Sequence, residues 1–248
     1  MTAETLRSLA LTVDWDKHRL FVIDNGSCEE THKVYDRQSQ MFPFEVIYNL
    51  VNRGTAKAIN QGWHHRLPGE HCVKMDNDVV FHQDEWVDWM EDVFRRDPTI
   101  GICGLKRKDL DEAPDGEGDY QSKLHMIPHI KGQRWIVVEE VKSVMGTCQA
   151  YSSALLDKMG YLDQPDLYGF DDALSAVRCR LAGFRSVFLH GFEIDHIDPG
   201  GTPFGDWKKI EARRQFPMFN SMVLLYESGI LPLRKEYDGD EARSSKCV

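Results

Sequence analysis

The sequence predicts an α/β fold, a single domain built on a mostly parallel, doubly wound sheet. Short apolar runs alternate along the chain with stretches of helical periodicity, which is typical of parallel strands covered by helices on both faces. Three of the apolar runs lead into acidic groups, at Asp24, Asp76 and Asp195. Ligands of such sheets bind outside the carboxyl ends of the strands, so these groups predict a functional site there.

Apolar runs bounded by turn residues mark the predicted strands. The first, at 19–23, is apolar after its initial arginine, as suits a strand covered on both faces, and Asn25-Gly26 predicts the turn that follows it. The run at 186–189 leads on to His196. We expect strands at 19–23, 44–48, 72–75, 100–105, 135–138, 141–144 and 186–189.

Helical periodicity is clearest after Glu85, where apolar residues recur on one face at the i, i+3, i+4, i+7 and i+8 positions. A first helix is expected at 2–10, with Thr2 as its cap and with Leu6 and Leu9 facing a core. Further helices are expected at 54–63, at 153–159, at 171–182 before Gly183, and at 207–226 with an interruption at Pro217.

Composition and charge favour a soluble, cytoplasmic protein. No apolar run in the 248 residues is long enough to be a transmembrane segment, and no signal peptide precedes the first helix. The six cysteines form no C-x-x-C pair, so we expect reduced thiols, several of them buried. The net charge of −10 argues against a nucleic-acid partner, and the basic clusters at 106–108 and 208–214 are interpreted as solvated faces.

No Pro/Gly/Ser-rich linker and no repeat divides the chain. We therefore expect one domain over 1–235, a loop at 109–120, and a charged, mobile tail at 236–248.

Two carboxylates flank one residue in Asp76-Asn77-Asp78, directly after the 72–75 strand. Hard divalent cations such as Mn²⁺ and Mg²⁺ prefer carboxylate oxygens, and an ion here would neutralise a departing diphosphate. The alternative is an Asx turn at a strand end, since Asp-x-Asp is common by chance. His196 follows another strand end. A lone histidine is more often structural, but beside carboxylates at the same sheet edge it becomes a candidate metal ligand.

Three further motifs have both a structural and a binding interpretation. Asp24, in the turn 24–27, can accept hydrogen bonds from a base or a ribose, or simply form that turn. In 52–62, glycine and alanine allow close backbone approach and a helix start beside Lys57 suits phosphate, although a packed core helix has the same composition. Asp171-Asp172 begins a helix, where a carboxylate can be a cap or an ionised general base.

In their order and spacing these motifs resemble those of the family 2 glycosyltransferases, which have the A-type, Rossmann-like nucleotide-sugar-binding fold. The resemblance covers about residues 2–200 and rests on the segments 22–27, 52–62, 76–78, 171–183 with its Arg178 and Arg180, and His196. It implies a catalytic domain over 1–235 that transfers a sugar from a nucleoside-diphosphate sugar to an acceptor hydroxyl, with inversion and with Mn²⁺ or Mg²⁺ as cofactor. The acceptor stays open: a glycan, a small molecule, a protein or a modified nucleic acid.

The same resemblance gives each motif a role. Asp172, beside Asp171, is implied as the catalytic base, and Asp78 as a metal ligand together with His196 and Asp76. The donor is implied to lie against Asp24 at the nucleobase, and against Ser27, Asn52, Gly54, Lys57, Asp76 and Asn77. In related enzymes the segment after the strand-end histidine folds over the donor. We therefore expect a loop at 199–203 that is mobile without ligand, and Lys208 or Lys209 reaching the diphosphate.

The chain departs from the family pattern in two ways. Asp171 stands where glutamate is usual, and the sequence begins at the expected first helix, so we expect the family's first strand to be missing from it. We therefore expect a sheet position beside the 19–23 strand that is unfilled or filled by another segment.

Two other functions are alternatives. A nucleotidyltransferase shares the sheet and the acidic metal site, but usually has an N-terminal glycine-rich loop with a basic residue, which this sequence lacks. The second alternative is a catalytically inactive nucleotide-sugar-binding protein.

Overall fold

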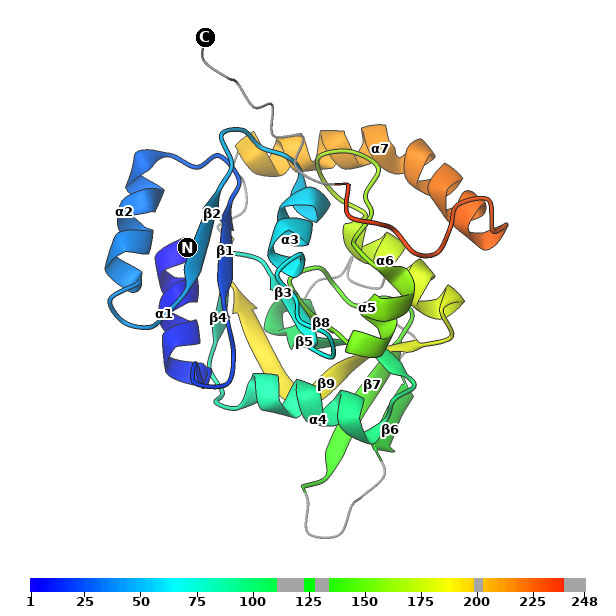
Figure 1. Cartoon of the computed structure of the whole chain (residues 1–248), viewed down its shortest axis with the longest axis horizontal. Coiled ribbons are helices and arrows are strands. Elements are labelled where there is room, and N and C mark those ends of the chain that lie inside the picture. Colours follow the sequence, from blue (N-terminus) through cyan, green and yellow to red (C-terminus); the bar gives the residue numbers. More distant parts are fainter. Residues whose placement is uncertain (111–122, 128–133, 199–202, 239–248) are drawn as a thin grey trace.

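The structure is a computed structural model that describes residues 1–110, 123–127, 134–198 and 203–238. Helices flank both faces of a seven-stranded sheet, and a two-stranded sheet lies beside it (Figure 1). The strands are β1 (Phe21–Asp24), β2 (Glu45–Tyr48), β3 (Cys72–Met75), β4 (Val79–Phe81), β5 (Ile100–Arg107), β6 (Lys123–Ile127), β7 (Ile136–Val141), β8 (Cys148–Tyr151) and β9 (Arg185–His196). The helices are α1 (Thr2–Thr12), α2 (Glu29–Gln38), α3 (Thr55–Trp63), α4 (Trp86–Arg96), the 3-10 turn η1 (Lys108–Leu110), α5 (Ser153–Met159), α6 (Asp171–Leu181) and α7 (Pro203–Glu227).

Two hydrophobic clusters, one on each face of the large sheet, explain the two helical layers. Neighbouring residues of β5 point to opposite faces, so Cys103 packs in the cluster of α1 and α4, whereas Ile102 packs in the cluster of α3, α5 and α6. Leu6 and Leu9 of α1 are buried, as predicted. The predicted apolar stripe of α4 is also buried, through Trp86, Met90, Val93 and Phe94.

Two predicted helix features are wrong. Thr2 does not cap α1: Met1 is the N-cap residue, no side chain caps the helix, and the Thr2 hydroxyl accepts a hydrogen bond from Asn77. Pro217 does not interrupt α7, which is one helix of 25 residues. A proline removes a single backbone donor, and the adjoining turns of this long helix continue past it.

The prediction of a mostly parallel sheet is wrong. The seven-stranded sheet is mixed, with the order β3-β8-β5-β9-β7-β6 and β4 on β9, and of its described pairs only β5–β9 is parallel. Three segments that were not predicted as strands, β4, β6 and β8, all enter it antiparallel. Residues 141–144 are not a separate strand, because β7 ends at Val141. Strand direction depends on pairing between distant segments, which a local apolar pattern does not contain.

β1 and β2 form a parallel sheet of their own. Glu45 donates its N–H to the carbonyl of Leu20, and Asn49 donates its N–H to the carbonyl of Asp24. The backbone N–H and C=O groups of the even-numbered residues of β1 therefore point toward β2. Within the described ranges, no strand pairs with the other edge of β1. This agrees with the expected unfilled position beside the 19–23 strand.

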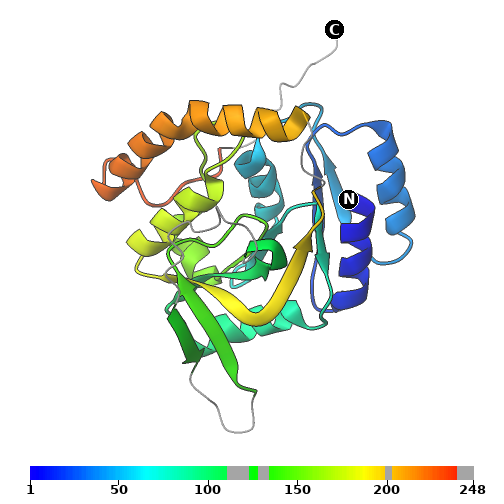
Figure 2. The ribbon, with the colours of Figure 1, turned by 180° about the vertical axis from the view of Figure 1, so that it is seen from behind.

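The remaining architecture brings the C-terminal part of the chain to the site. β9 is a single long strand that bends along its length (Figure 2), and α7, which follows it, packs along α6. Among the described helices, none has the length and apolarity needed to cross a membrane. The five cysteines in the described ranges are free thiols, and Cys103, Cys148 and Cys179 are buried, as expected. The predicted loops at 109–120 and 199–203 and the tail at 236–248 lie mostly outside the described residues.

Candidate active site

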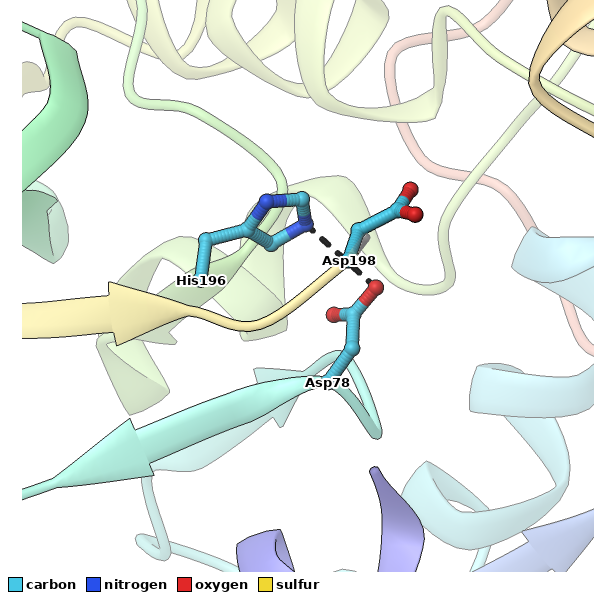
Figure 3. Close-up of side chains that lie close together, drawn as sticks. All are labelled: Asp78, His196 and Asp198. Carbon is cyan, nitrogen blue, oxygen red and sulfur yellow. Dashed lines mark ion pairs between the residues drawn. The ribbon is translucent and has the colours of Figure 1, made fainter. Parts of the chain in front are cut away.

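The pairing of β4 with β9 brings two predicted metal ligands together. Val79 lies opposite His196, and the Ile197 N–H donates to the Asp78 carbonyl at 2.8 Å, so the chain just before β4 lies beside the end of β9. His196 Nε2 is 3.3 Å from Asp78 Oδ2. Asp198 completes a group whose potential ligand atoms all lie within 4.8 Å of one another (Figure 3).

The chemistry of this group fits a divalent cation. Asp78 Oδ1 is buried and accepts no hydrogen bond from the described residues, although an unpaired buried oxygen is costly unless a ligand or water satisfies it. Two carboxylates and an imidazole suit Mn²⁺, and the carboxylates also suit Mg²⁺. Asp198 was not predicted, although its spacing from His196 repeats that of Asp76 from Asp78. Asp76, a predicted ligand, lies outside this group of three.

The predicted acidic pair begins α6. Gly169 and Phe170 have consecutive positive φ angles of 83° and 64°, and this left-handed turn leads the chain into the helix. The Asp172 carboxylate accepts hydrogen bonds from the N–H groups of Gly146, at 3.1 Å, and Ala173, at 2.8 Å. Burial and then the charge of Asp171 raise the pKa of Asp172, so this carboxyl is a stronger base than an ordinary aspartate.

Lys74, which the sequence analysis missed, is the ion-pair partner of Asp171. It lies inside β3 and is only 4% exposed. Burial, the largest influence, would lower the pKa of Lys74, but the charges of Asp171 and of the other acidic groups around it together raise the pKa above the ordinary value. A signal was present in the sequence, since a lysine within an apolar strand needs a buried partner of opposite charge.

Asp76 interacts electrostatically with a member of the metal group, Asp78, and with both residues of the acidic pair. Burial raises its pKa to about 7; Lys74 opposes the rise, and Asp78, Asp171 and Asp172 add to it. Tyr168 lies on the loop before α6. Burial, and then the negative charges of Asp76, Asp171, Asp172 and Asp78, raise the pKa of Tyr168 to about 12. The two predicted halves of the catalytic machinery therefore share one electrostatic environment.

Lys208, predicted to reach a diphosphate, lies next to this environment. Its ammonium is 3.5 Å from Asp198 Oδ2 and 5.8 Å from the centre of the Tyr168 ring. Trp207 packs on the same ring, with 5.5 Å between the ring centroids. Lys209 instead points to Asp206, and the side chains of both are 77% exposed. Of the two lysines, Lys208 is the one that the fold places at the site.

Asp24, predicted to contact the nucleobase, is buried and fully hydrogen-bonded within the chain. One carboxylate oxygen accepts from the N–H groups of Gly26 and Ser27, at 3.0 and 2.8 Å, and the other accepts from the Tyr35 hydroxyl at 3.0 Å. Burial by itself would raise the pKa of Asp24, but these hydrogen bonds together hold it below its usual value. The carboxylate orders the turn after β1, and Ser27 is exposed on that turn.

Asn52 and Gly54 shape the start of α3. Asn52 Oδ1 accepts from the side chain of Asn25 and from the Gly54 N–H, both at 2.9 Å. Gly54 has a φ of 89°, and a Cβ on it would lie 3.0 Å from the Leu167 backbone, so glycine is required there.

The start of α3 is not open to a phosphate in the way the sequence suggested. The Thr55 N–H donates to the Leu167 carbonyl and the Ala56 N–H to Gln164, so these two helix-start donors are already paired. Lys57 is exposed in the first turn. Asn77 is exposed too, and its amide donates to Thr2 at 2.9 Å.

The family follows from a comparison with protein-family models. The model of glycosyl transferase family 2 matches residues 1–160, well over half of the chain. The chain belongs to glycosyl transferase family 2. Two curated relatives are the poly-beta-1,6-N-acetyl-D-glucosamine synthases of Staphylococcus epidermidis, 23% identical over 175 residues, and of Staphylococcus aureus strain COL, 24% identical over 185 residues. These matches cover 70% and 74% of the family 2 chain but only 42% and 44% of the relatives, so it spans less than half of their length.

Solved structures share the fold at low sequence identity. A mannosyltransferase from Pyrobaculum calidifontis, in complex with GDP-Man and Mn²⁺, superposes with a TM-score of 0.66 at 16% identity, over 89% of this chain and 59% of that one. GalNAc-T7 with UDP, GalNAc and Mn²⁺ gives 0.57 at 14% identity, over 78% and 40%. TarS residues 1–349 of S. aureus, with UDP, gives 0.56 at 18% identity, over 77% and 55%. The α/β fold of this family 2 chain is thus the A-type glycosyltransferase fold.

Proposed function

We propose that this family 2 chain is a metal-dependent glycosyltransferase that moves a sugar from a nucleoside-diphosphate sugar to an acceptor hydroxyl with inversion. The observation that carries the proposal is the electrostatic link between two elements. A group able to bind a cation (Asp78, His196 and Asp198) shares its electrostatic environment with Asp172, a carboxylate of raised pKa. A transferase of this type needs both a group that stabilises the leaving diphosphate and a base for the acceptor.

Asp78, His196 and Asp198 would hold Mn²⁺ or Mg²⁺. When bound, the cation neutralises charge on the departing diphosphate. Lys208 lies beside Asp198 and would add a second positive charge on the same side. Asp76 stands close to both groups and would accept a hydrogen bond from the ribose or the sugar.

Asp172 would remove the proton from the acceptor hydroxyl as its oxygen attacks the anomeric carbon. The hydrogen bonds from Gly146 and Ala173 fix its orientation without providing a proton acceptor of their own. One base on the face opposite the leaving group is sufficient for a single displacement, and a single displacement inverts the anomeric centre.

The donor side of the proposal is built from the turn after β1 and the start of α3. Asp24 would fix this turn, so that Ser27 and the backbone near it contact the nucleobase of the donor. A direct contact between Asp24 and the nucleobase stays a prediction. Asn52 and Gly54 hold the loop before α3, where Lys57 projects. Asn77 remains a predicted donor contact and would have to release Thr2 to make it.

The ligands of the solved relatives support the donor class and the metal. GDP-Man with Mn²⁺ occupies one of those structures, and UDP occupies two others, one of them with Mn²⁺. We therefore propose a guanosine or uridine diphosphate sugar as donor. The acceptor is left open between a glycan, a small molecule, a protein and a modified nucleic acid.

The decisive experiment combines binding and product analysis. Calorimetric titrations with UDP- and GDP-sugars, with and without MnCl₂, should detect a donor whose binding requires the metal, and an acceptor panel should then release free nucleoside diphosphate. Asp78→Asn should abolish the metal requirement together with tight binding. Asp206→Asn, which changes a 77% exposed carboxylate on α7, is the matched control and should behave as wild type.

Two results would replace the proposal. Release of pyrophosphate from a nucleoside triphosphate and a sugar 1-phosphate, in a parallel assay, would identify a nucleotidyltransferase. Absence of metal-dependent binding for every nucleotide sugar would identify a catalytically inactive member of the family.

A further inference from the structure

Lys74 is a buried charged residue in a strand whose other residues are apolar. It lies between Val73 and Met75 in β3, and its side chain crosses the interior to the start of α6. Its ammonium pairs with Asp171, 97 residues further along the chain, and that carboxylate is itself buried. A buried ion pair seldom adds stability over apolar packing, so its presence at a buried position of β3 points to a purpose other than folding.

The ion pair borders directly on Asp172. A Cβ built on Gly146 would lie 3.2 Å from the Lys74 ammonium and 3.3 Å from an oxygen of Asp172, so both groups flank the same glycine. The Gly146 N–H also donates to that oxygen. Lys74 and Asp172 are therefore neighbours, although the ion pair of Lys74 goes to the adjacent residue.

Lys74 is the cation that offsets the neighbouring carboxylate at Asp172. The groups that influence Asp172 are the carboxylates of Asp171 and Asp76 and the ammonium of Lys74, with the phenols of Tyr151 and Tyr168 nearby. Neighbouring buried carboxylates cannot all stay ionised without compensation, and one of them takes up a proton. A proton on Asp172 would remove the proposed base.

We infer that Lys74 is a positioning residue for Asp172: by neutralising Asp171 it leaves the second carboxylate of the pair ionised and free to accept the acceptor's proton. The inference rests on the proposed function. It divides the acidic pair into two roles, with Asp171 as the anchor of the ammonium and Asp172 as the group that meets the acceptor. Lys74 touches no substrate in this scheme.

A charge-compensation cycle tests the inference. Lys74→Met keeps the shape of the side chain and leaves two adjacent carboxylates without a cation, so kcat should fall by about 10²-fold, the scale of a lost base, with a small change in donor KM. Asp171→Asn removes the repelling charge. The double variant Lys74→Met/Asp171→Asn should recover at least about 10-fold of the kcat lost in Lys74→Met, because both charges of the pair are then absent.

The pH profile gives a second readout that a merely structural role would not move. The acid limb of kcat should shift to higher pH in Lys74→Met and to lower pH in Asp171→Asn. Lys235→Met is the matched control. The Lys235 ammonium is 3.0 Å from Asp163 and forms no ion pair with Asp171 or Asp172 among the described residues, so this variant should leave the acid limb in place. An unmoved acid limb in Lys74→Met, or a double variant no better than Lys74→Met, would overturn the inference.

A readout without turnover separates this inference from the proposed function. Carboxyl ¹³C NMR titration, with the Asp172 signal assigned by its loss in Asp172→Asn, should show the Asp172 pKa rising in Lys74→Met and falling in Asp171→Asn. Equal Asp172 titration in wild type and Lys74→Met would overturn the inference even in an active enzyme. If no nucleotide sugar is turned over but the two shifts appear, the proposed function is wrong and the electrostatic coupling stands.

Discussion

The two sides of the candidate site differ in how their carboxylates are satisfied. Asp24, on the β1 side, has both oxygens hydrogen-bonded within the chain and a lowered pKa. On the other side, Asp78 has a buried oxygen that no described residue satisfies, and the pKa of Asp76 and of Asp172 is raised. The first side is complete as folded, whereas the second keeps unbalanced charge. Unbalanced buried charge is the better indication of where a ligand and the chemistry belong.

The sharpest test of this contrast is at Asp172. Asp172→Asn should reduce turnover by roughly 10²- to 10⁴-fold, the usual contribution of a positioned acid or base, while fold and donor binding are kept. The amide can still accept the Gly146 N–H but cannot take a proton. Single-turnover kinetics with a saturating donor, together with circular dichroism, checks the result. Near-normal turnover would remove Asp172 from the role of base.

The next largest effect is expected at the metal group. Asp78→Asn and His196→Ala should each weaken Mn²⁺-dependent donor binding by at least about 10-fold, because each removes one of three convergent ligands. Calorimetric titration of MnCl₂ in the presence of donor measures this. Asp198→Asn tests the ligand that the sequence analysis missed, and an unchanged Mn²⁺ affinity in that variant would reduce the group to two residues.

A substitution of Asp24 should have the opposite effect from substitutions of Asp172 and of the metal group: it should reduce the stability of the fold more than it reduces activity. Asp24→Asn replaces one of the two accepting oxygens by an NH2 group, which only donates, so either the N–H groups of Gly26 and Ser27 or the Tyr35 hydroxyl loses its acceptor, at a cost of about 1–3 kcal/mol in the free energy of unfolding. Urea unfolding measures the change. A rise in donor KM larger than the stability loss explains would instead establish the predicted base contact.

The pH dependence sharpens the same comparison. The pKa of Asp24 is lower in the folded chain than its usual value, so its ionised form favours folding above about pH 4 and this contribution is lost as the pH falls through the lowered folded pKa. The stability difference between wild type and Asp24→Asn should therefore shrink in acid. A difference that stays constant from pH 7 to pH 3 would mean that the hydrogen bonds do not depend on the carboxylate charge.

Sequence reasoning predicted the residues of the candidate site whose own local sequence context marks them. Asp78 and His196 were predicted because each follows an apolar strand, and polar groups at strand ends meet at the sheet edge. Asp171 and Asp172 were predicted because they begin a helix.

The partners of these residues could not be predicted, because they lie far away in sequence. Lys74 meets Asp171 across 97 residues, and Tyr35 reaches Asp24 from a helix that was not predicted. The mixed sheet escaped prediction for the same reason. β8 and β6 enter it antiparallel through long-range pairing, whereas the alternation of strands and helices along the chain suggested parallel neighbours. The sequence pattern thus predicted which acidic residues and histidine form the candidate site, but not which residues balance their charges.

The smallest expected effect distinguishes two lysines on one helix. Lys208 lies 3.5 Å from Asp198, whereas Lys209 points to Asp206 and is 77% exposed. Lys208→Glu should raise the donor KM by roughly 10-fold through the loss of one phosphate-facing charge and the gain of a repulsive one, and Lys209→Glu should change it less than about 2-fold. Donor KM at low and high salt measures both. If the two variants weaken acceptor binding instead, with a smaller salt slope, the basic cluster binds a polyanionic acceptor. If neither variant changes either constant, α7 presents only a solvated basic face, and the metal group completes the donor site without it.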